Sequence, residues 1–279
     1  MRRHTTSDRG FTLVEMIVVI VITGIIGGMV AVFIRAPVQG YIDSERRAEL
    51  TDMADTAFRR IARDVRTAVP NSVRITSTSI EFIPTRDGGR YRAASSSTGN
   101  PLVFGTSGTQ TFDVIGTPPS FLSTDYIVVG STQSGGTLPY DETAAGVLRT
   151  YVSGTQTVTF SSHTFPASAE LSSQRFDVVD GTQKAVTYAC ETDPAAVSGD
   201  GPMRLMRYWL YWSGSGIVHP TYTTGVSSSS AILATKLSNC AVTYSTANQR
   251  FGLLAIQLTL LSSGESVTLY NEIHVNNMP

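Results

Sequence analysis

The hydrophobic positions of the chain are concentrated near its N-terminus. Residues 11–34 read FTLVEMIVVIVITGIIGGMVAVFI and contain one charged side chain, Glu15. At about 1.5 Å of rise per residue, this run forms a helix of roughly 36 Å, enough to cross a hydrocarbon layer of about 30 Å. No later segment has a comparable apolar run. The pattern therefore predicts one transmembrane helix over residues 11–34.

The residues on either side of the apolar run indicate how that helix is placed. Residues 1–10, MRRHTTSDRG, carry three arginines and one aspartate, and basic residues before a spanning helix tend to stay in the cytoplasm. A secretory signal has a shorter apolar core and a small-residue cleavage site, whereas Arg35 and Pro37 follow this run. We therefore expect the helix to be retained as a single-pass anchor, with the rest of the chain outside the cytoplasm.

A second helical pattern follows Pro37. Apolar residues recur at helical spacing from Leu50 to Ala68, and Pro70 and Asn71 end the pattern. The other faces are acidic first and basic later, which complements a helix dipole. The sequence predicts an amphipathic helix over residues 35–69, with charges at Asp43, Glu45, Glu49, Asp52, Asp55, Arg59, Arg60, Arg63 and Arg66.

Beyond Pro70 the hydrophobic period changes to about two, which is typical of strands. The alternating residues of 254–260 and 267–275 form the clearest hairpin, which needs a covering layer that the amphipathic helix can supply. The Ser-, Thr- and Gly-rich segment 85–119 is either an ordered part of this domain or a mobile insertion. The predicted fold class is α+β, a long N-terminal helix packed on an antiparallel β-rich domain over residues 70–279. The other expected strands are 79–83, 126–130, 147–152, 157–160, 185–190 and 237–244.

Composition excludes some classes of function. The formal net charge is -1, so there is no basic excess of the kind that nucleic-acid binders carry. The four histidines are isolated, and the chain contains no phosphate-binding loop or catalytic motif that we recognise. We therefore expect no enzymatic activity, no cofactor and no nucleic-acid partner.

Three features of the outer region have two interpretations each. Cys190 and Cys240 are the only cysteines, and outside the cytoplasm we expect them to form a disulfide; a metal pair is the alternative, although no histidine or third cysteine flanks them at ligand spacing. The aromatic run 207–212, RYWLYW, is either a half-buried strand or a carbohydrate- or surface-binding platform.

The acidic loop after Cys190 is either a solvated cluster or a calcium site, with Glu191, Asp193 and Asp200 as the candidate ligands.

Glu15 needs an explanation, because a carboxylate inside an apolar span costs about 2.5 kcal/mol or more and usually has a partner. The apolar run contains no cation. Cleavage between Gly10 and Phe11 would create an amine four residues before Glu15, and this amine could pair with the Glu15 carboxylate of a neighbouring subunit. The alternative is a plain signal anchor that tolerates an acid near one interface.

The segment RGFTLVEMIVVIVITGII resembles the processing site of type IV prepilins and of the pseudopilins of type II secretion. The matching positions are Gly10, Phe11, Thr12, Leu13 and Glu15. The resemblance implies a pilin-like fold and a leader over residues 1–10, with cleavage by prepilin peptidase after Gly10 and methylation of the Phe11 amine. It also implies that Glu15 guides the subunit into a filament. In that setting the arginines of the second helix either form a solvated face or contact neighbouring subunits.

A finer resemblance is to the MshO-type minor pilins, which belong to the assembly systems of mannose-sensitive haemagglutinin (MSHA) pili. It rests on TAVPNSVRI at residues 67–75, on the paired cysteines and on the ending YNEIHVNNMP. Major pilins usually carry a proline inside the apolar helix, whereas Pro37 lies just beyond it, which favours a minor subunit. The resemblance implies an inner-membrane protein with a periplasmic domain that enters or primes a pilus. Its implied partners are the lipid bilayer, major and minor pilins and the inner-membrane assembly platform.

Two alternative functions stay open at this point. A minor pseudopilin of type II secretion would share the processing chemistry and differ in its partners. A membrane-anchored extracytoplasmic binding protein or enzyme would carry the leader pattern by chance.

Overall fold

The chain folds into two units that are described separately, Met1–Glu49 and Leu50–Pro279. The computed structural model describes residues 10–93, 98–105, 111–131, 138–143, 146–161, 163–209, 212, 221–222, 228–248 and 251–276.

One helix, α1 (Leu13–Arg66), contains both of the helical patterns seen in the sequence. Pro37 lies inside it; a proline removes one backbone hydrogen bond, and the helix continues on both sides. The helix ends at Arg66, earlier than the predicted Val69, because the backbone turns to pair with the strand region. The Val69 amide donates to the Ile83 carbonyl at 2.8 Å, and the Thr85 amide donates to the Thr67 carbonyl at 2.7 Å.

The α+β fold class is confirmed. The strands of the main sheet are all antiparallel and lie in the order β1-β2-β9-β10-β11-β12-β13. Their bounds are β1 Arg74–Ile75, β2 Ser79–Phe82, β9 Val186–Thr192, β10 Met203–Trp209, β11 Ser229–Asn248, β12 Phe251–Ser262 and β13 Glu265–Asn276.

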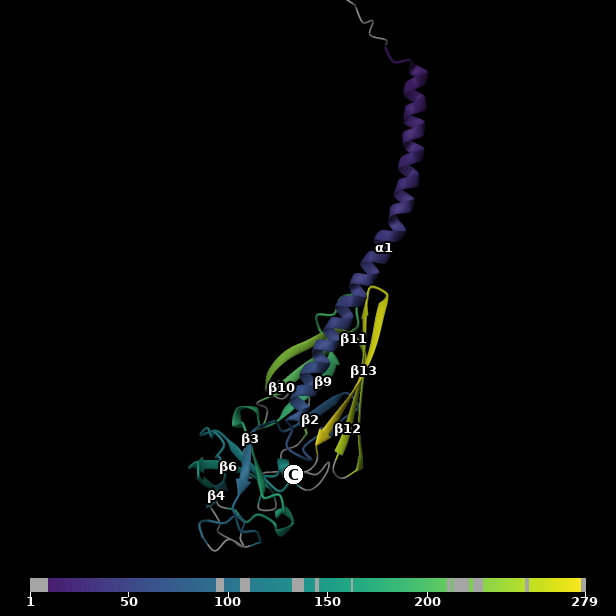
Figure 1. Cartoon of the computed structure of the whole chain (residues 1–279). Coiled ribbons are helices and arrows are strands. Elements are labelled where there is room, and N and C mark those ends of the chain that lie inside the picture. The colour runs from purple at the N-terminus through teal and green to yellow at the C-terminus, as the bar shows by residue number, and fades with distance from the viewer. Residues whose placement is uncertain are drawn as a thin grey trace, which may run out of the picture. The chain divides into compact units, whose positions relative to one another are not determined.

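The remaining strands close into a barrel in the order β3-β4-β7-β6-β5-β8. The barrel is inserted between β2 and β9, which pair with each other in the sheet, with Ser79 opposite Ala189. Figure 1 shows β3, β4 and β6 gathered in a lobe of their own. The bounds are β3 Thr85–Tyr91, β4 Thr111–Ile115, β5 Tyr126–Val129, β6 Leu148–Ser153, β7 Thr157–Phe160 and β8 Arg175–Val179, with short 3₁₀ turns η1 Leu138–Tyr140, η2 Ala167–Ala169 and η3 Gly181–Gln183.

Of the two interpretations of residues 85–119, the ordered one holds for β3 and β4, which belong to this barrel. Phe112 and Val114 of β4 are fully buried in its core. Gly89 of β3 serves close packing, because a Cβ atom there would lie 2.8 Å from the ring of Phe176. A glycine that sequence reading took as a sign of mobility is needed here for space.

The C-terminal hairpin has the predicted register. Leu254 pairs with Ile273 and Leu260 with Val267, and the chain turns at Ser263 and Gly264, which both have positive φ, as a two-residue hairpin loop requires. The two strands and the second part of α1 share one core. Its helical members are Leu50, Ala54, Ala57, Phe58, Ile61 and Val65.

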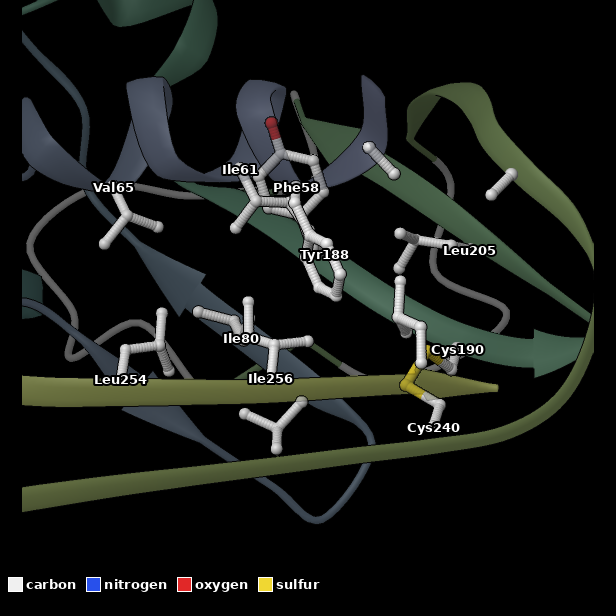
Figure 2. Close-up of a cluster of buried hydrophobic side chains, with 14 of the residues drawn as sticks. Phe58, Ile61, Val65, Ile80, Tyr188, Cys190, Leu205, Cys240, Leu254 and Ile256 are labelled. Carbon is white, nitrogen blue, oxygen red and sulfur yellow. A yellow bond between two sulfur atoms is a disulfide. The ribbon is translucent and has the colours of Figure 1, made fainter. Parts of the chain in front are cut away.

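Figure 2 shows this core, with Phe58, Ile61 and Val65 of α1 facing Ile80, Leu254 and Ile256 of the sheet. A polar cluster at the end of the helix adds direction to this apolar contact. Asp64 of α1 accepts hydrogen bonds from Tyr188 of β9 at 2.6 Å and from Arg207 of β10 at 3.2 Å. These bonds fix which side of the helix faces the sheet.

The disulfide between Cys190 and Cys240 is confirmed. It joins β9 to β11 across β10, and both cysteines belong to the core beneath α1. The bond therefore ties together strands that are separated by 50 residues of chain.

Replacing both cysteines, as Cys190→Ala with Cys240→Ala, is expected to lower the free energy of unfolding by about 4 kcal/mol, because the unfolded chain loses its closed loop. Urea denaturation of the detergent-solubilised protein, followed by tryptophan fluorescence, measures this change. Adding reductant should lower the wild-type midpoint and leave that of the double variant unchanged. An unchanged midpoint in the double variant relative to wild type would contradict a stabilising disulfide.

Candidate processing and assembly segment

The bond between Gly10 and Phe11 lies in exposed backbone that precedes the helix. Neither residue is helical, and the Phe11 side chain is 77% exposed. Gly10 has no positive φ, and a Cβ atom added there would meet nothing within 4 Å. The fold of this chain therefore does not require glycine at position 10, whereas recognition by another protein would account for it.

Thr12 and Glu15 form the start of the helix. The Glu15 amide donates to the Thr12 hydroxyl at 3.3 Å, and the Met16 amide donates to the Thr12 carbonyl at 3.2 Å. Threonine before the helix and glutamate three residues later have the spacing of a capping box, and an acid in the first turn is favoured by the helix dipole. Glu15 thus has a local role at the helix start, which the sequence analysis missed although the T-x-x-E spacing signals it.

The apolar part of α1 is bare. The side chains of residues 11–34 are exposed throughout, and α1 is long and apolar enough to cross a membrane. The hydroxyl of Thr23, in the middle of the span, donates to the Val19 carbonyl at 2.6 Å, so this group needs no outside partner. A surface of this kind must be covered by lipid or by other helices.

The structure does not bring the three candidate calcium ligands together as a cation site. Glu191 accepts hydrogen bonds from Arg204 at 2.7 Å and from Tyr208 at 2.7 Å. Asp193 accepts from the Ala195 amide, and Asp200 accepts from the Ser262 hydroxyl. Within the described residues, no group of three or more His, Cys, Asp or Glu side chains is placed to hold a metal ion. The acidic loop is held by hydrogen bonds and an arginine instead.

The aromatic run 207–212 begins as an interior strand. Arg207, Tyr208 and Trp209 lie in β10, which pairs with β9 on one side and β11 on the other, and Tyr208 is 9% exposed. This matches the strand interpretation for these three residues; residues 210 and 211 lie outside the described part of the chain.

A groove of about 670 Å³ runs beside α1, next to this strand. Arginines of the helix line one side, and apolar residues of the sheet line the other. Ile232 of β11, one of these apolar residues, is 56% exposed. The lining includes Arg59, Arg60, Arg63, Arg207, Trp209 and Ile232.

A smaller cleft of about 310 Å³ contains Asp177 of β8. The neighbouring Phe176 and Val178 are buried in the barrel core, so the Asp177 side chain points to the opposite side, where Arg66, Arg86 and Arg175 also line the cleft. Burial raises the pKa of the Asp177 carboxyl to about 6, and Arg175 offsets this only in part. The carboxylate is therefore the main form at neutral pH, but it is less stable in the folded protein than in the unfolded chain.

Comparison with known families identifies the N-terminal segment alone. The model of the prokaryotic N-terminal methylation motif matches residues 5–31. The searches of curated proteins and of solved structures return no match. The motif supports a type IV pilin-like or pseudopilin protein that is processed by prepilin peptidase, handled by pilin assembly machinery and anchored in a membrane.

The substitution Asp177→Asn is expected to stabilise the protein above pH 6. The folded-state pKa of about 6 lies above the usual 3.8, so the carboxyl costs stability progressively as pH rises from about 4 to 6. Removing it should add on the order of 1 to 3 kcal/mol at pH 7.5 and almost nothing at pH 4. Urea denaturation of both proteins across this pH range measures the difference.

Asp87→Asn on the neighbouring strand is the matched control. Burial acts to raise the pKa of Asp87, but hydrogen bonds from Ser120 and Gly88 bring it below its usual value, so this substitution should destabilise the protein at neutral pH. His163, whose pKa is lowered to about 4 by burial and by Arg149, is unchanged in both variants and cancels in the comparison. An Asp177→Asn effect that is constant from pH 4 to 7.5 would contradict the titration.

Proposed function

We propose that this protein is a minor type IV pilin of the MSHA-like kind, cleaved after Gly10, N-methylated at Phe11 and incorporated into a pilus or its initiating complex. The observation that carries the proposal is the match to the processing motif, together with a Gly10–Phe11 bond that lies in exposed, non-helical backbone directly before an exposed apolar helix. The outer domain acts through contacts, and the protein has no enzymatic activity. Its partners are prepilin peptidase, major and minor pilins, the inner-membrane assembly platform and the bilayer.

The chemistry of the mature end supports this assignment. Cleavage after Gly10 leaves Phe11 as a charged amine next to the carboxylate-bearing first turn. A carboxylate in an apolar environment needs a cation, and no side chain of residues 11–34 is a cation. The amine of a neighbouring subunit supplies the charge when helices pack together, so that Glu15 contributes to the axial position of the incoming subunit.

A minor rather than a major role is supported by the position of Pro37, which lies after the apolar run instead of inside it. A minor pseudopilin of type II secretion is the second candidate, since the methylation motif is common to both groups. The two functions differ in the machinery that the mature subunit enters, so the filament or secretion complex that contains the protein distinguishes them. A membrane-anchored binding protein or enzyme would show no processing at Phe11.

The substitution Gly10→Val is expected to abolish cleavage, so that the leader stays attached to the protein in the cell envelope. The chain itself has room for the added side chain at position 10, and a loss of processing therefore reports recognition by the peptidase. Gly40→Val, in α1 and also with open surroundings, is the control and should be processed normally. Intact-mass and N-terminal peptide mass spectrometry measure the outcome; a wild-type protein that keeps its first ten residues would overturn the proposal.

The substitution Glu15→Gln is expected to leave cleavage intact and to deplete the protein from sheared pili, because the neutral amide cannot pair with a neighbour's amine. Glu272→Gln, on the exposed face of β13, is the control and should be incorporated like wild type. Immunoblots of the sheared and membrane fractions measure the distribution. Normal incorporation of the Glu15→Gln protein would rule out the charge pairing.

A further inference from the structure

A straight row of exposed side chains follows α1 on the side away from the core. Its members are spaced alternately by four and three residues, which places them on one side of an α-helix. All of them are exposed, whereas Leu50, Ala54, Ala57 and Ile61 are buried. The row consists of Glu45, Glu49, Asp52, Thr56, Arg59, Arg63 and Arg66.

The helix dipole does not account for this separation of charge. A dipole favours acids only in the first turn of a helix, and α1 begins at Leu13, far from the acidic positions. The sequence-based explanation by the dipole is therefore wrong for the acids, and it holds for Arg63 and Arg66 in the last turn. An uninterrupted acidic row followed by an uninterrupted basic row needs another cause.

The two halves of the row match each other in spacing. Each acid precedes one arginine by 14 residues, as Glu45 precedes Arg59, Glu49 precedes Arg63 and Asp52 precedes Arg66. Fourteen residues of α-helix rise by about 21 Å. Two parallel copies of the helix, shifted by this distance, would place three acids of one copy opposite three arginines of the other.

The basic half of the row is available for such a contact. Neither Arg63 nor Arg66 forms an ion pair within the described part of the chain. Arg59 pairs with Asp55 at 2.7 Å, but both side chains are exposed, and a surface pair of this kind is weak and easily exchanged.

The groove beside the helix adds an apolar side to the basic row. Arg59 and Arg63 line it together with Trp209, Ile232 and Leu233, and Ile232 is more than half exposed. A second helix lying along the arginines would cover this apolar surface as well as the charges.

We propose that the row Arg59, Arg63 and Arg66 receives the row Glu45, Glu49 and Asp52 of a second copy of this chain, parallel to the first and shifted by 14 residues. This deepens the proposed function and rests on it, because a shared membrane origin makes the copies parallel. A shift of about 21 Å exceeds half the thickness of a bilayer core of about 30 Å. The contact therefore belongs to a rising filament and not to two copies anchored side by side at equal depth.

Cross-linking between two variants that each carry one added cysteine, with Cys190 and Cys240 kept in their disulfide, tests the register in the native cell envelope. One tagged copy carries Glu49→Cys and a differently tagged copy carries Arg63→Cys; a short bis-maleimide should join them in sheared filaments and not in the membrane pool. In the control, Thr56→Cys takes the place of Arg63→Cys. Thr56 is exposed on the same row, but its distance from position 49 is half of the 14-residue shift. The yield of the cross-linked product that carries both tags should be about tenfold higher for positions 49 and 63 than for the control. A difference of this size is expected for a register fixed by a few exposed ion pairs.

Charge exchange provides the second measurement. With the cysteines kept at positions 49 and 63, Arg59→Glu with Arg66→Glu in both copies should lower the cross-linked yield about tenfold, because like charges then face each other. Adding Glu45→Arg with Asp52→Arg to the same chains should restore it, since the reversed rows again match. A product dominated by 49 with 56, a product that joins position 63 to a different protein, or a failed rescue would overturn the proposal.

The readouts separate this inference from the proposed function. If Phe11 is methylated and the protein is present in sheared pili, but the product of 49 with 63 is absent, the register is wrong and the pilin assignment stands. If the leader is retained and the protein is absent from pili, both fail.

Discussion

The need to cover the apolar surface of residues 11–34 constrains every state of this protein. That surface is exposed throughout in the isolated chain, so it needs a cover of lipid and, in the proposed assembly, of other helices. The two environments make different demands on the one acid in the run. In lipid, Glu15 can remain near an interface at the helix start, where Thr12 holds its amide. Among helices, its carboxylate needs a cation from outside the chain. The same residue therefore serves the membrane state through its backbone and the assembled state through its side chain.

The second part of α1 has one side fixed on the sheet and therefore presents a defined outer surface. Its apolar face is fixed on the sheet by Phe58, Ile61 and Val65, and Asp64 adds directional bonds to Tyr188 and Arg207. Apolar contacts alone permit small rotations of a helix, whereas a carboxylate shared between two strands does not. With the core side of the helix fixed, the charged row is fixed on the opposite side. The order of the outer domain is thus a condition for any register that this row sets between subunits.

Sequence reasoning succeeded where the pattern was local and failed where the pairing was distant. The helical period from Leu50 onward and the alternation in the C-terminal hairpin gave the helix, the hairpin and their shared core. The barrel was missed because it is inserted between β2 and β9, whose pairing of Ser79 with Ala189 joins positions far apart in the chain. The residue pattern within a single strand does not predict such a pairing. The sequence also did not predict the burial of Glu81. This charged strand residue is only 1% exposed and pairs with Arg74. At the N-terminus the motif identified Gly10, Phe11 and Glu15, while the capping role of Thr12 was missed although the T-x-x-E spacing indicates it.

The position of the proposed cleavage site suits the stability of the mature helix. Cleavage after Gly10 leaves Phe11 and Thr12 in front of the first helical residue, Leu13. Thr12 thereby keeps both of its bonds, from the Glu15 amide to its hydroxyl and from the Met16 amide to its carbonyl. A cut after Thr12 would remove both acceptors from amides that face an apolar medium, where unpaired backbone groups are costly. A cut well before Gly10 would leave the arginine-bearing leader ahead of the helix and place the new amine far from Glu15. The bond after Gly10 satisfies both conditions: it preserves the cap and brings the amine close to the first-turn carboxylate.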